Sequence, residues 1–236
     1  MTQPYSQQER NYWKQIAGEA AAKLVEDGMF IGLGTGSTAK AFIQALAQRV
    51  QAGLHIAGAV ASSQESADLA ASLGIPITTL DLHPKLDLYV DGADEIDPDL
   101  RLIKGGGGAL LREKIVATAS KRFIVITDVT KKVQCLGLTF ALPIEVVPFA
   151  LATVLLHLQT LEIPAQLRQH AGDTFITENH NVILDCTFSN GISNPERIHT
   201  QLHNIVGVVE TGLFYDIVDQ AIIAGPEGIE VLNPPT

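Results

Sequence analysis

Cysteine is scarce in this sequence, which has 236 residues and two thiols, Cys135 and Cys186. The two lie far apart in the chain, and neither belongs to a C-x-x-C pair. Cysteines this few and this distant do not indicate the disulfide framework of a secreted protein. We therefore interpret both as reduced side chains that pack in a cytosolic protein.

Long hydrophobic runs are also missing, although 46% of the residues are hydrophobic. No run approaches the ~20 apolar residues that a membrane helix needs. The amino-terminal residues MTQPYSQQERNYWKQ are polar and lack the apolar segment of a signal peptide. We therefore expect a cytoplasmic protein without a membrane partner. The hydrophobic fraction instead predicts a sizeable core, and the 18% of charged residues argues against disorder.

Basic side chains are outnumbered, since 16 Lys and Arg stand against 26 Asp and Glu, for a net charge of −10. This balance opposes nucleic acid or an anionic membrane as a general partner, because both are themselves negatively charged. A small anionic substrate is compatible with it under one condition. Lysines and backbone N–H groups must then gather locally to bind the anion.

Strand-like and helical patterns alternate through the first half of the chain. Apolar runs predict strands, and helical spacing of apolar residues such as Phe42, Leu46 and Val50 predicts helices between them. The expected strands are residues 29–33, 55–60, 75–80, 86–90 and 122–127, and the expected helices are residues 7–26, 109–119, one reaching residue 50 and one reaching residue 73. Ser62 and Glu65 fit a capping box at the start of the helix that ends at residue 73. The alternation predicts an α/β fold with a Rossmann-like, mostly parallel sheet and helices on both faces.

The pattern changes after about Lys132, where prolines punctuate the chain. Pro148 can start a helix through residue 161, and Asn194-Pro195 pairs an N-cap with a proline at the first position of a helix to about residue 204. The expected strands are residues 174–177, 182–187, 208–214, 220–224 and 230–232. We therefore expect a small α+β domain, residues 133–207, inserted into a Rossmann-like catalytic domain of residues 1–132 and 208–236.

A glycine-rich turn, Gly32-Leu33-Gly34-Thr35-Gly36-Ser37, joins the first of these strands to a helix. It departs from the dinucleotide fingerprint, because Ser37 replaces the third glycine and no acid ends the second strand. The phosphate-binding Walker pattern also fails, since no Gly-Lys-Ser/Thr follows. Two interpretations remain, a hydroxyl-rich anion loop at a helix start and an ordinary tight turn.

An acidic cluster follows the strand at residues 86–90 and consists of Asp91, Asp94, Glu95, Asp97 and Asp99. In open α/β sheets the ligand crevice lies beyond the carboxyl ends of the strands, which is where this cluster should fall. It could be a solvated loop, a divalent metal site or a set of carboxylates that transfer protons. The spacing does not fit an EF-hand, because the required glycine and closing glutamate are missing.

Lys104 precedes four glycines that lead directly into a helix. Linkers usually run longer and contain serine, so this loop suggests N–H groups that stabilise negative charge on a substrate oxygen. Glu113 lies within the helix, and its neighbours three and four residues away are apolar. If buried, such a carboxylate would have a raised pKa and would suit a general base. Arg112 and Lys114 have similar neighbours, and the pattern alone favours one solvated turn on a buried helix.

The seven histidines are scattered through the sequence. His199 and His203 are spaced i, i+4 on an expected helix, which is a spacing that two metal ligands can adopt. No third ligand is evident nearby in the sequence. We therefore interpret both as surface histidines.

Four motifs occur in order, namely GLGTGST, DGADEID, KGGGGALLREK and TDVTK. With them, the sequence closely resembles ribose-5-phosphate isomerase, type A, over nearly its whole length. The resemblance implies interconversion of D-ribose 5-phosphate and D-ribulose 5-phosphate in the pentose phosphate pathway and the Calvin cycle. It also implies that no metal and no cofactor is needed, and that the chain forms a homodimer or, in some members, a tetramer.

By this resemblance, Glu113 matches the catalytic base of the family. Asp91 and Asp94 match its substrate-binding acids, with Asp91 implicated in opening the sugar ring, and Lys104 matches the lysine that faces the reacting oxygens. The remaining positions that match substrate-binding residues are Lys14, Thr35, Gly36, Ser37, Thr38, Gly92, Ala93, Gly105, Gly106, Gly107 and Lys131. Among these, the lysines and hydroxyls are expected to bind the phosphate group.

Two residues beside the loop depart from the family, because Gly108 stands where an alanine is common and Leu111 where a threonine is common. Both bear on the stiffness of the loop more than on its chemistry. One carboxylate can remove a proton next to a carbonyl and return it to the neighbouring carbon through an enediolate, if the oxyanion is stabilised. The alternatives are a non-catalytic sugar-phosphate sensor, a related sugar-phosphate deaminase and a metal-dependent enzyme.

Overall fold

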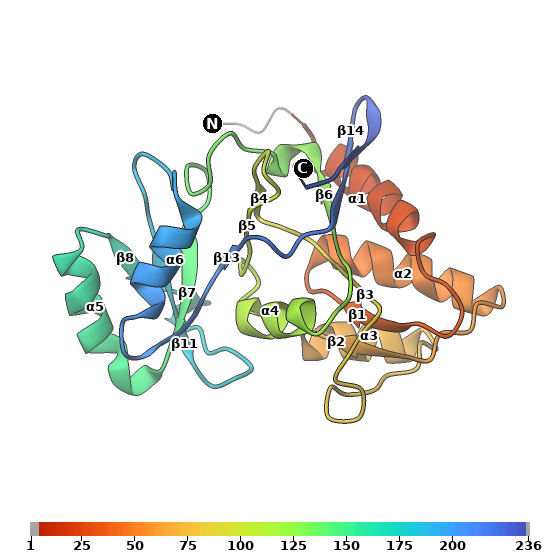
Figure 1. Ribbon diagram of the computed structural model, residues 1–236, viewed down its shortest axis with the longest axis horizontal. Helices are drawn as coiled ribbons and strands as arrows, with labels where there is room; N and C mark the ends of the chain where they lie inside the picture. Colours follow the sequence, from red (N-terminus) through yellow and green to blue (C-terminus); the bar gives the residue numbers. More distant parts are fainter. Residues whose placement is uncertain (1–4, 235–236) are drawn as a thin grey trace. The chain divides into compact units, whose positions relative to one another are not determined.

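The structure, a computed structural model, describes residues 5–234, which divide into two compact units. The first unit contains the described residues up to Ala93, Arg112–Lys132, and those from Ile217 onward. The second unit contains Asp94–Leu111 and Val133–Asp216. The chain therefore passes from one unit to the other several times, as its colours in Figure 1 show.

A six-stranded sheet forms the centre of the first unit, with the strand order β15-β14-β6-β3-β1-β2. Its strands are β1 (Phe30–Leu33), β2 (Gly58–Ala61), β3 (Leu88–Asp91), β6 (Phe123–Asp128), β14 (Gln220–Gly225) and β15 (Gly228–Leu232). Neighbouring strands pair in parallel, except that β14 and β15 form an antiparallel hairpin. The predicted α/β class with a mostly parallel sheet is thus confirmed.

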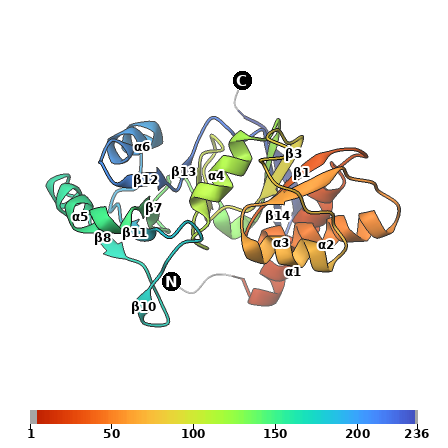
Figure 2. The same cartoon turned by 90° about the horizontal axis from the view of Figure 1, so that it is seen from below.

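Helices cover both faces of this sheet. Side chains along a strand point alternately to one face and the other, so each face presents side chains against which a helix packs. Helices α1 (Gln7–Ala22), α2 (Ser37–Gln51) and α3 (Gln64–Ser72) share one apolar core with Ile31 and Leu33 of β1. The opposite face is covered by α4 (Leu110–Thr118), as Figure 2 shows. There a Cβ on Gly32 would lie 2.7 Å from Val116 of α4 and 2.6 Å from Tyr89. Glycine at position 32 therefore allows helix and sheet to approach closely.

Two expectations about the first unit are wrong in detail. Helix α3 is capped by Ser63, whose hydroxyl accepts a first-turn N–H at 3.3 Å, and not by the capping box of Ser62 and Glu65. The segment at residues 75–80 forms no strand and contributes one bridge, between Ile77 and Ala59. Its alternation of apolar residues predicts a strand, but too few of its backbone groups pair with β2.

An antiparallel sheet with the order β12-β7-β11-β8 forms the centre of the second unit. The strands of this unit are β4 (Glu95–Ile96), β5 (Leu102–Ile103), β7 (Leu142–Val146), β8 (Ala165–Leu167), β9 (Gln169–His170), β10 (Asp173–Thr174), β11 (Val182–Cys186), β12 (Val208–Thr211) and β13 (Leu213–Phe214). Helix α5 (Leu151–Thr160) follows the 3₁₀ turn Pro148–Ala150, and α6 (Pro195–His203) begins at the N-cap Asn194. The unit is of α+β type.

Residues 94–111 and 208–216 group with this second unit, beyond the bounds of 133–207 that the sequence suggests. Strand β5 pairs with β13, and the Lys104 N–H donates to the carbonyl of Gly212 at 2.9 Å. Strand β12 pairs with β7 at the edge of the antiparallel sheet. These pairings join segments that lie about 110 or about 65 residues apart, which no local pattern reveals.

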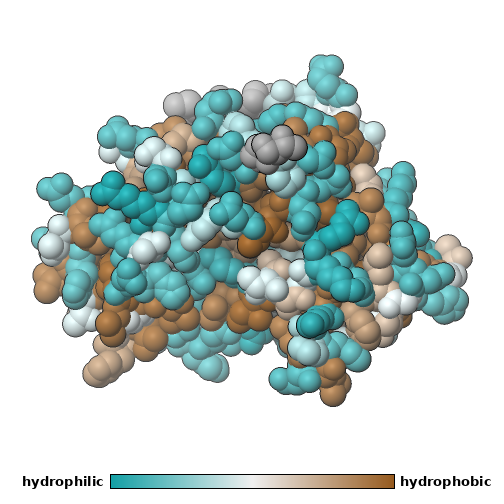
Figure 3. Space-filling model, in the orientation of Figure 1, coloured by the Kyte–Doolittle hydropathy of each residue, from teal (hydrophilic) through white to brown (hydrophobic). Residues whose placement is uncertain are grey.

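No helix within residues 5–234 is long and apolar enough to cross a membrane. Hydrophilic side chains cover much of the face drawn in Figure 3, with apolar residues between them. Both cysteines are free, with Cys186 buried and Cys135 half-buried. Burial of Cys186 in the core of the second unit agrees with its interpretation as a packing residue.

Candidate active site

The loop between β1 and α2 in the first unit presents the start of a helix. Its Gly36 is the N-cap of α2, with φ of 91°, a conformation that favours glycine. Because glycine has no side chain, it cannot accept hydrogen bonds from the first N–H groups of α2. Those donors and the positive end of the helix dipole suit an anion. Ser37 and Thr38, the first two residues of the helix, add hydroxyl groups at the same place.

One lysine of the first unit reaches this helix start, and the charge of a second acts on the first. The Lys14 ammonium donates to the Ser37 hydroxyl at 3.0 Å. Burial lowers the pKa of Lys14 most; the charge of Asp128 opposes the shift, and the positive charges of Lys131 and Arg10 add to it. Lys131 belongs to the short 3₁₀ turn that follows β6. The first unit thus brings together Lys14, Ser37 and Lys131, which is the local concentration of cations that an anionic substrate requires.

Asp91 ends β3, and its carboxylate is held in one orientation. Its Oδ1 accepts the N–H of Thr35 at 3.0 Å and that of Gly92 at 2.7 Å, and its Oδ2 accepts the hydroxyl of Tyr89. Gly34 makes this possible, because a Cβ there would lie 2.0 Å from Oδ1. Asp91 is thereby fixed to the glycine-rich loop by backbone donors.

Glu113 lies on α4, the helix that covers the same face of the sheet as Tyr89, and 4% of its surface is exposed. The negative charge of Glu113 acts on Tyr89 at that face. The pKa of Tyr89 is raised first by burial and then by the charges of Asp91 and Glu113. Glu113 is thus buried, which is the condition under which the sequence favours a general base at this position. Two carboxylates of the first unit therefore share one buried environment around a phenol.

The other hydroxyls of the loop continue this polar network. Thr35 and Ser62 join through their hydroxyl oxygens, which are 2.7 Å apart. Thr38 lies against Gly92, where a Cβ would be 3.5 Å from the Thr38 Cβ. Ala93, which follows Gly92, is half-buried at the end of the first unit.

In the second unit, the four-glycine loop is fastened to Asp94. The Gly106 N–H donates to the Asp94 carboxylate at 2.7 Å, and a Cβ on Gly106 would lie 2.6 Å from it. Lys104 is buried, with 3% of its surface exposed, and its ammonium lies 5.6 Å from the centre of the Phe214 ring. Gly105 has φ of 102°, and Gly107 is exposed. The loop is therefore an ordered part of this unit rather than a flexible linker.

Arg168 supports the loop from within the second unit. Its guanidinium donates to the carbonyl oxygens of Gly105 at 2.6 Å and Gly106 at 3.2 Å, and it pairs with Asp185. Gly108 has φ of 83°, and a Cβ there would lie 2.4 Å from the ring of Phe175. Glycine at 108, where the resemblance leads us to expect alanine, thus accommodates that ring.

The remaining acids of the cluster bind protein donors in the second unit. Glu95 accepts backbone N–H groups of Gly137 at 2.6 Å, Thr139 at 2.9 Å and Phe140 at 2.8 Å. Asp97 and Asp99 pair with Arg101 at 2.7 Å and 3.0 Å. Glu95 thus fastens residues 137–140 to β4, and Asp97 and Asp99 stabilise the turn that contains Arg101.

Comparison with known proteins identifies the family. Residues 58–228 match the family Ribose 5-phosphate isomerase A (phosphoriboisomerase A). The chain belongs to this family. Ribose-5-phosphate isomerase A of Bacillus mycoides is 54% identical over 217 residues, covering 92% of this chain and 97% of that one. The enzyme of Synechococcus is 51% identical over 223 residues, covering 93% and 96%.

Solved structures of the family agree with the fold. Ribose 5-phosphate isomerase from Plasmodium falciparum superposes with a TM-score of 0.92 at 35% identity, over 96% of this chain and all of the other. A D-ribose-5-phosphate isomerase in complex with phospho-erythronic acid superposes with a TM-score of 0.91 at 39% identity, over 95% and 99%. The resemblance that the four motifs suggest is thus confirmed at the level of the family.

Sequence reasoning missed two residues of the site, Tyr89 and Ser62. Tyr89 precedes Asp91 by two positions in a strand, so both side chains point to the same face. That spacing could have indicated the contact, but the apolar character of β3 favoured a purely structural interpretation. The sequence predicts a helix cap at Ser62, whereas its contact with Thr35 depends on the pairing of β1 with β2.

Proposed function

We propose that this chain interconverts D-ribose 5-phosphate and D-ribulose 5-phosphate as an aldose–ketose isomerase. The observation that carries the proposal is the pair of buried carboxylates, Asp91 and Glu113, whose charges both act on Tyr89. Membership of the ribose-5-phosphate isomerase A family supports it. The relative with phospho-erythronic acid supports it too, since that ligand is a phosphorylated sugar acid.

The phosphate group binds at the start of α2. Lys14, Ser37 and Lys131 supply positive charge and a hydroxyl, and the helix supplies N–H donors. Thr35, Gly36 and Thr38 line the same turn. Binding energy from this group, which takes no part in the reaction, fixes the sugar relative to the carboxylates.

Glu113 moves the proton. As its carboxylate, it takes the proton from C2 of the open-chain aldose. The C–H electron pair becomes the C1=C2 double bond of an enediolate, and the π pair of the C1 carbonyl moves onto O1. The resulting carboxylic acid returns the proton to C1, while the hydroxyl proton on O2 passes to O1, so that the ketose forms with no net change in protons. General base catalysis contributes about 10²–10⁴-fold, so the enediolate must also be stabilised.

Asp91 and Lys104 act on the oxygen atoms of the sugar. When the ring opens, Asp91 accepts the proton of the anomeric hydroxyl, the bond between C1 and the ring oxygen breaks, and Asp91 passes the proton to that oxygen. This requires the fixed orientation that Thr35 and Gly92 impose. Lys104 and the N–H groups of Gly105, Gly106 and Gly107 stabilise the enediolate oxygen, and loss of one such donor costs about 3–4 kcal/mol in other enzymes. Asp94, together with Gly92 and Ala93, binds the sugar. The roles of Asp94, Lys104 and the glycines rest on their match to the family motifs.

The setting of the reaction is also part of the proposal. We infer a cytoplasmic homodimer or tetramer that serves the pentose phosphate pathway or the Calvin cycle without metal or cofactor. Nucleic acid and membranes have no part in it. Family membership does not favour a sugar-phosphate sensor or a deaminase.

The direct test is the conversion of D-ribose 5-phosphate by the purified chain in the presence of a chelator. Ketose formation at a rate that the chelator leaves unchanged is the expected result. No conversion would reject the isomerase, and a rate that falls to zero with chelator would reject catalysis without metal. Ammonia release from an amino-sugar phosphate would favour the deaminase instead.

A further inference from the structure

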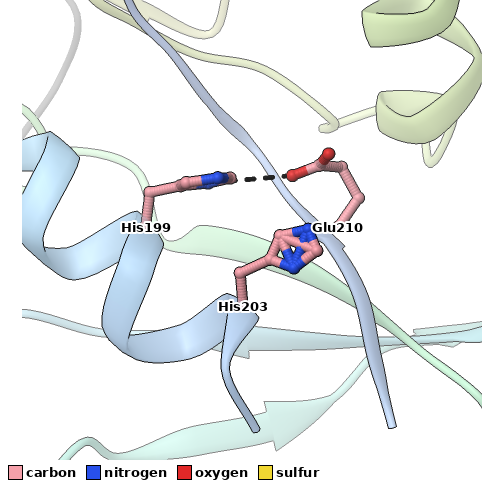
Figure 4. Close-up of side chains that lie close together, drawn as sticks. All are labelled: His199, His203 and Glu210. Carbon is pink, nitrogen blue, oxygen red and sulfur yellow. Dashed lines mark ion pairs between the residues drawn. The ribbon is translucent and has the colours of Figure 1, made fainter. Parts of the chain in front are cut away.

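Three potential metal ligands meet in the second unit. His199 and His203 lie on the same face of α6, and Glu210 lies on β12. One ligand atom from each residue lies within 4.8 Å of the others, and the three side chains converge in Figure 4. The sequence shows no third ligand because Glu210 is joined to the histidines by the packing of α6 against β12. His203 is exposed, as expected of a surface histidine, and His199 is half-buried.

The His199 ring is held in a defined orientation. Its Nδ1 lies 2.8 Å from the Thr211 hydroxyl oxygen and 3.7 Å from Glu210 Oε1. The rings of His203 and Tyr215 pack edge-on against it, with centroids 5.3 Å and 5.5 Å away. An outer partner that orients the imidazole is typical of histidines that bind metal. His203 is exposed and can rotate toward an ion, whereas His199 and Glu210 are half-buried.

The surroundings favour a cation. His203 lies in the last turn of α6, at the negative end of the helix dipole. The Glu210 carboxylate, 3.7 Å from His199, adds negative charge at the same place.

We propose that His199, His203 and Glu210 form a binding site for one divalent transition-metal ion, with Zn²⁺ as the best match. Two imidazoles and one carboxylate are the ligands of known three-residue zinc sites, which leave a fourth position for water. Zinc ligands lie about 2 Å from the ion, and hence roughly 3.4 Å apart in a tetrahedron. The three ligand atoms lie within 4.8 Å of one another, and His203 is the exposed member whose ring can turn to bring them closer. Mg²⁺ and Ca²⁺ prefer oxygen ligands and fit less well.

An ion at this site joins α6 to β12 and stabilises the second unit, because a ligand that binds the folded state alone adds to its free energy of unfolding. The site takes no part in the proposed isomerisation, which uses none of these three residues. Its success or failure is therefore separate from that of the proposed function.

The test is a calorimetric titration of the intact, chelator-treated protein with Zn²⁺. One ion should bind per chain, and His203→Ala and Glu210→Gln should each weaken binding by at least about 10-fold, since even the loss of an outer partner of a ligand costs that much. His157→Ala is the matched control, because His157 is exposed on α5 and bonds to the Thr153 carbonyl at 2.8 Å. This variant should bind as the wild type does. No binding, or full binding by His203→Ala, would overturn the proposal.

Two further measurements on the wild type guard against variants that fold poorly. Co²⁺ should give visible absorption typical of four or five ligands without a thiolate charge-transfer band; that band would place the ion at a cysteine and overturn the proposal. Zn²⁺ should also raise the Tm of the wild type and of His157→Ala, and leave that of His203→Ala unchanged. An equal rise in all three would overturn it as well.

Discussion

The hydroxyl of Tyr89 donates a hydrogen bond to the carboxylate of Asp91 inside the first unit, where neither side chain reaches solvent. The bond fixes Oδ2, while backbone donors fix Oδ1. The charge of Glu113 also raises the pKa of Tyr89, so the phenol interacts with both carboxylates of the proposed mechanism. Tyr89 thus acts as a positioning residue for Asp91.

The variant Tyr89→Phe tests this role. A hydrogen bond to a charged group contributes about 1.5–3 kcal/mol, so kcat should fall by about 10-fold or more if the orientation of Asp91 depends on it. KM should change little, because the phosphate site is untouched. Steady-state kinetics with D-ribose 5-phosphate provide the measurement. Tyr12→Phe is the control, since Tyr12 is 60% exposed on α1; an unchanged kcat in Tyr89→Phe would remove the positioning role.

Gly34→Ala should displace the Asp91 carboxylate by steric overlap alone. The added Cβ would lie 2.0 Å from the Asp91 carboxylate, which must move away from the Thr35 N–H. We expect a loss of stability of about 1–3 kcal/mol, typical of overpacking, together with a large fall in kcat. Denaturant unfolding and kinetics measure the two effects.

Gly53→Ala is the control for this variant. Its Cβ meets nothing within 4 Å, but φ of 109° strains any residue other than glycine. It should lose stability and keep the kcat of the folded protein. A Gly34→Ala enzyme that lost stability but kept its kcat would contradict the role given to the orientation of Asp91.

The pH dependence of KM tests the phosphate site. Lys14 has a lowered pKa, so it loses its charge at a lower pH than an ordinary lysine. KM should therefore rise as Lys14 loses its charge, which gives the pH profile of KM an alkaline limb. Lys131→Ala should raise KM by about 10-fold or more, because a hydrogen bond to a charged group is lost. Lys131 lowers the pKa of Lys14, so its removal should also move the limb to higher pH.

Lys132→Ala is the neighbouring control, since Lys132 pairs with Glu230 at 2.7 Å. It should leave both KM and the position of the limb unchanged. An alkaline limb that stayed in place in Lys131→Ala would show that the two lysines do not act on one site.

Local pattern predicts those parts of the structure that depend on neighbouring residues. The strand–loop–helix unit around Ser37, the strand that ends at Asp91 and the helix with Glu113 all follow from periodicity and glycine placement. The N-cap at Asn194 does so as well. Each of these depends on interactions within a few residues.

What sequence could not predict depends on contacts between distant segments. Glu210 reaches His199 only because β12 packs beside α6, and residues 94–111 join the second unit only because β5 pairs with β13. The choice between Ser62 and Ser63 as the helix cap depends on β2, since Ser62 instead bonds across to β1. Hydrophobic periodicity contains no information about such pairings.

In the proposed mechanism, the Glu113 carboxylate transfers the proton between C2 and C1. Glu113→Gln keeps the shape of the side chain but removes the base, and Glu227→Gln, in the exposed turn between β14 and β15, is the matched control. Conversion of D-ribose 5-phosphate should be lost in Glu113→Gln, while calorimetry shows sugar-phosphate binding close to that of the wild type. Retained turnover in Glu113→Gln, at a rate near that of Glu227→Gln, would contradict the account.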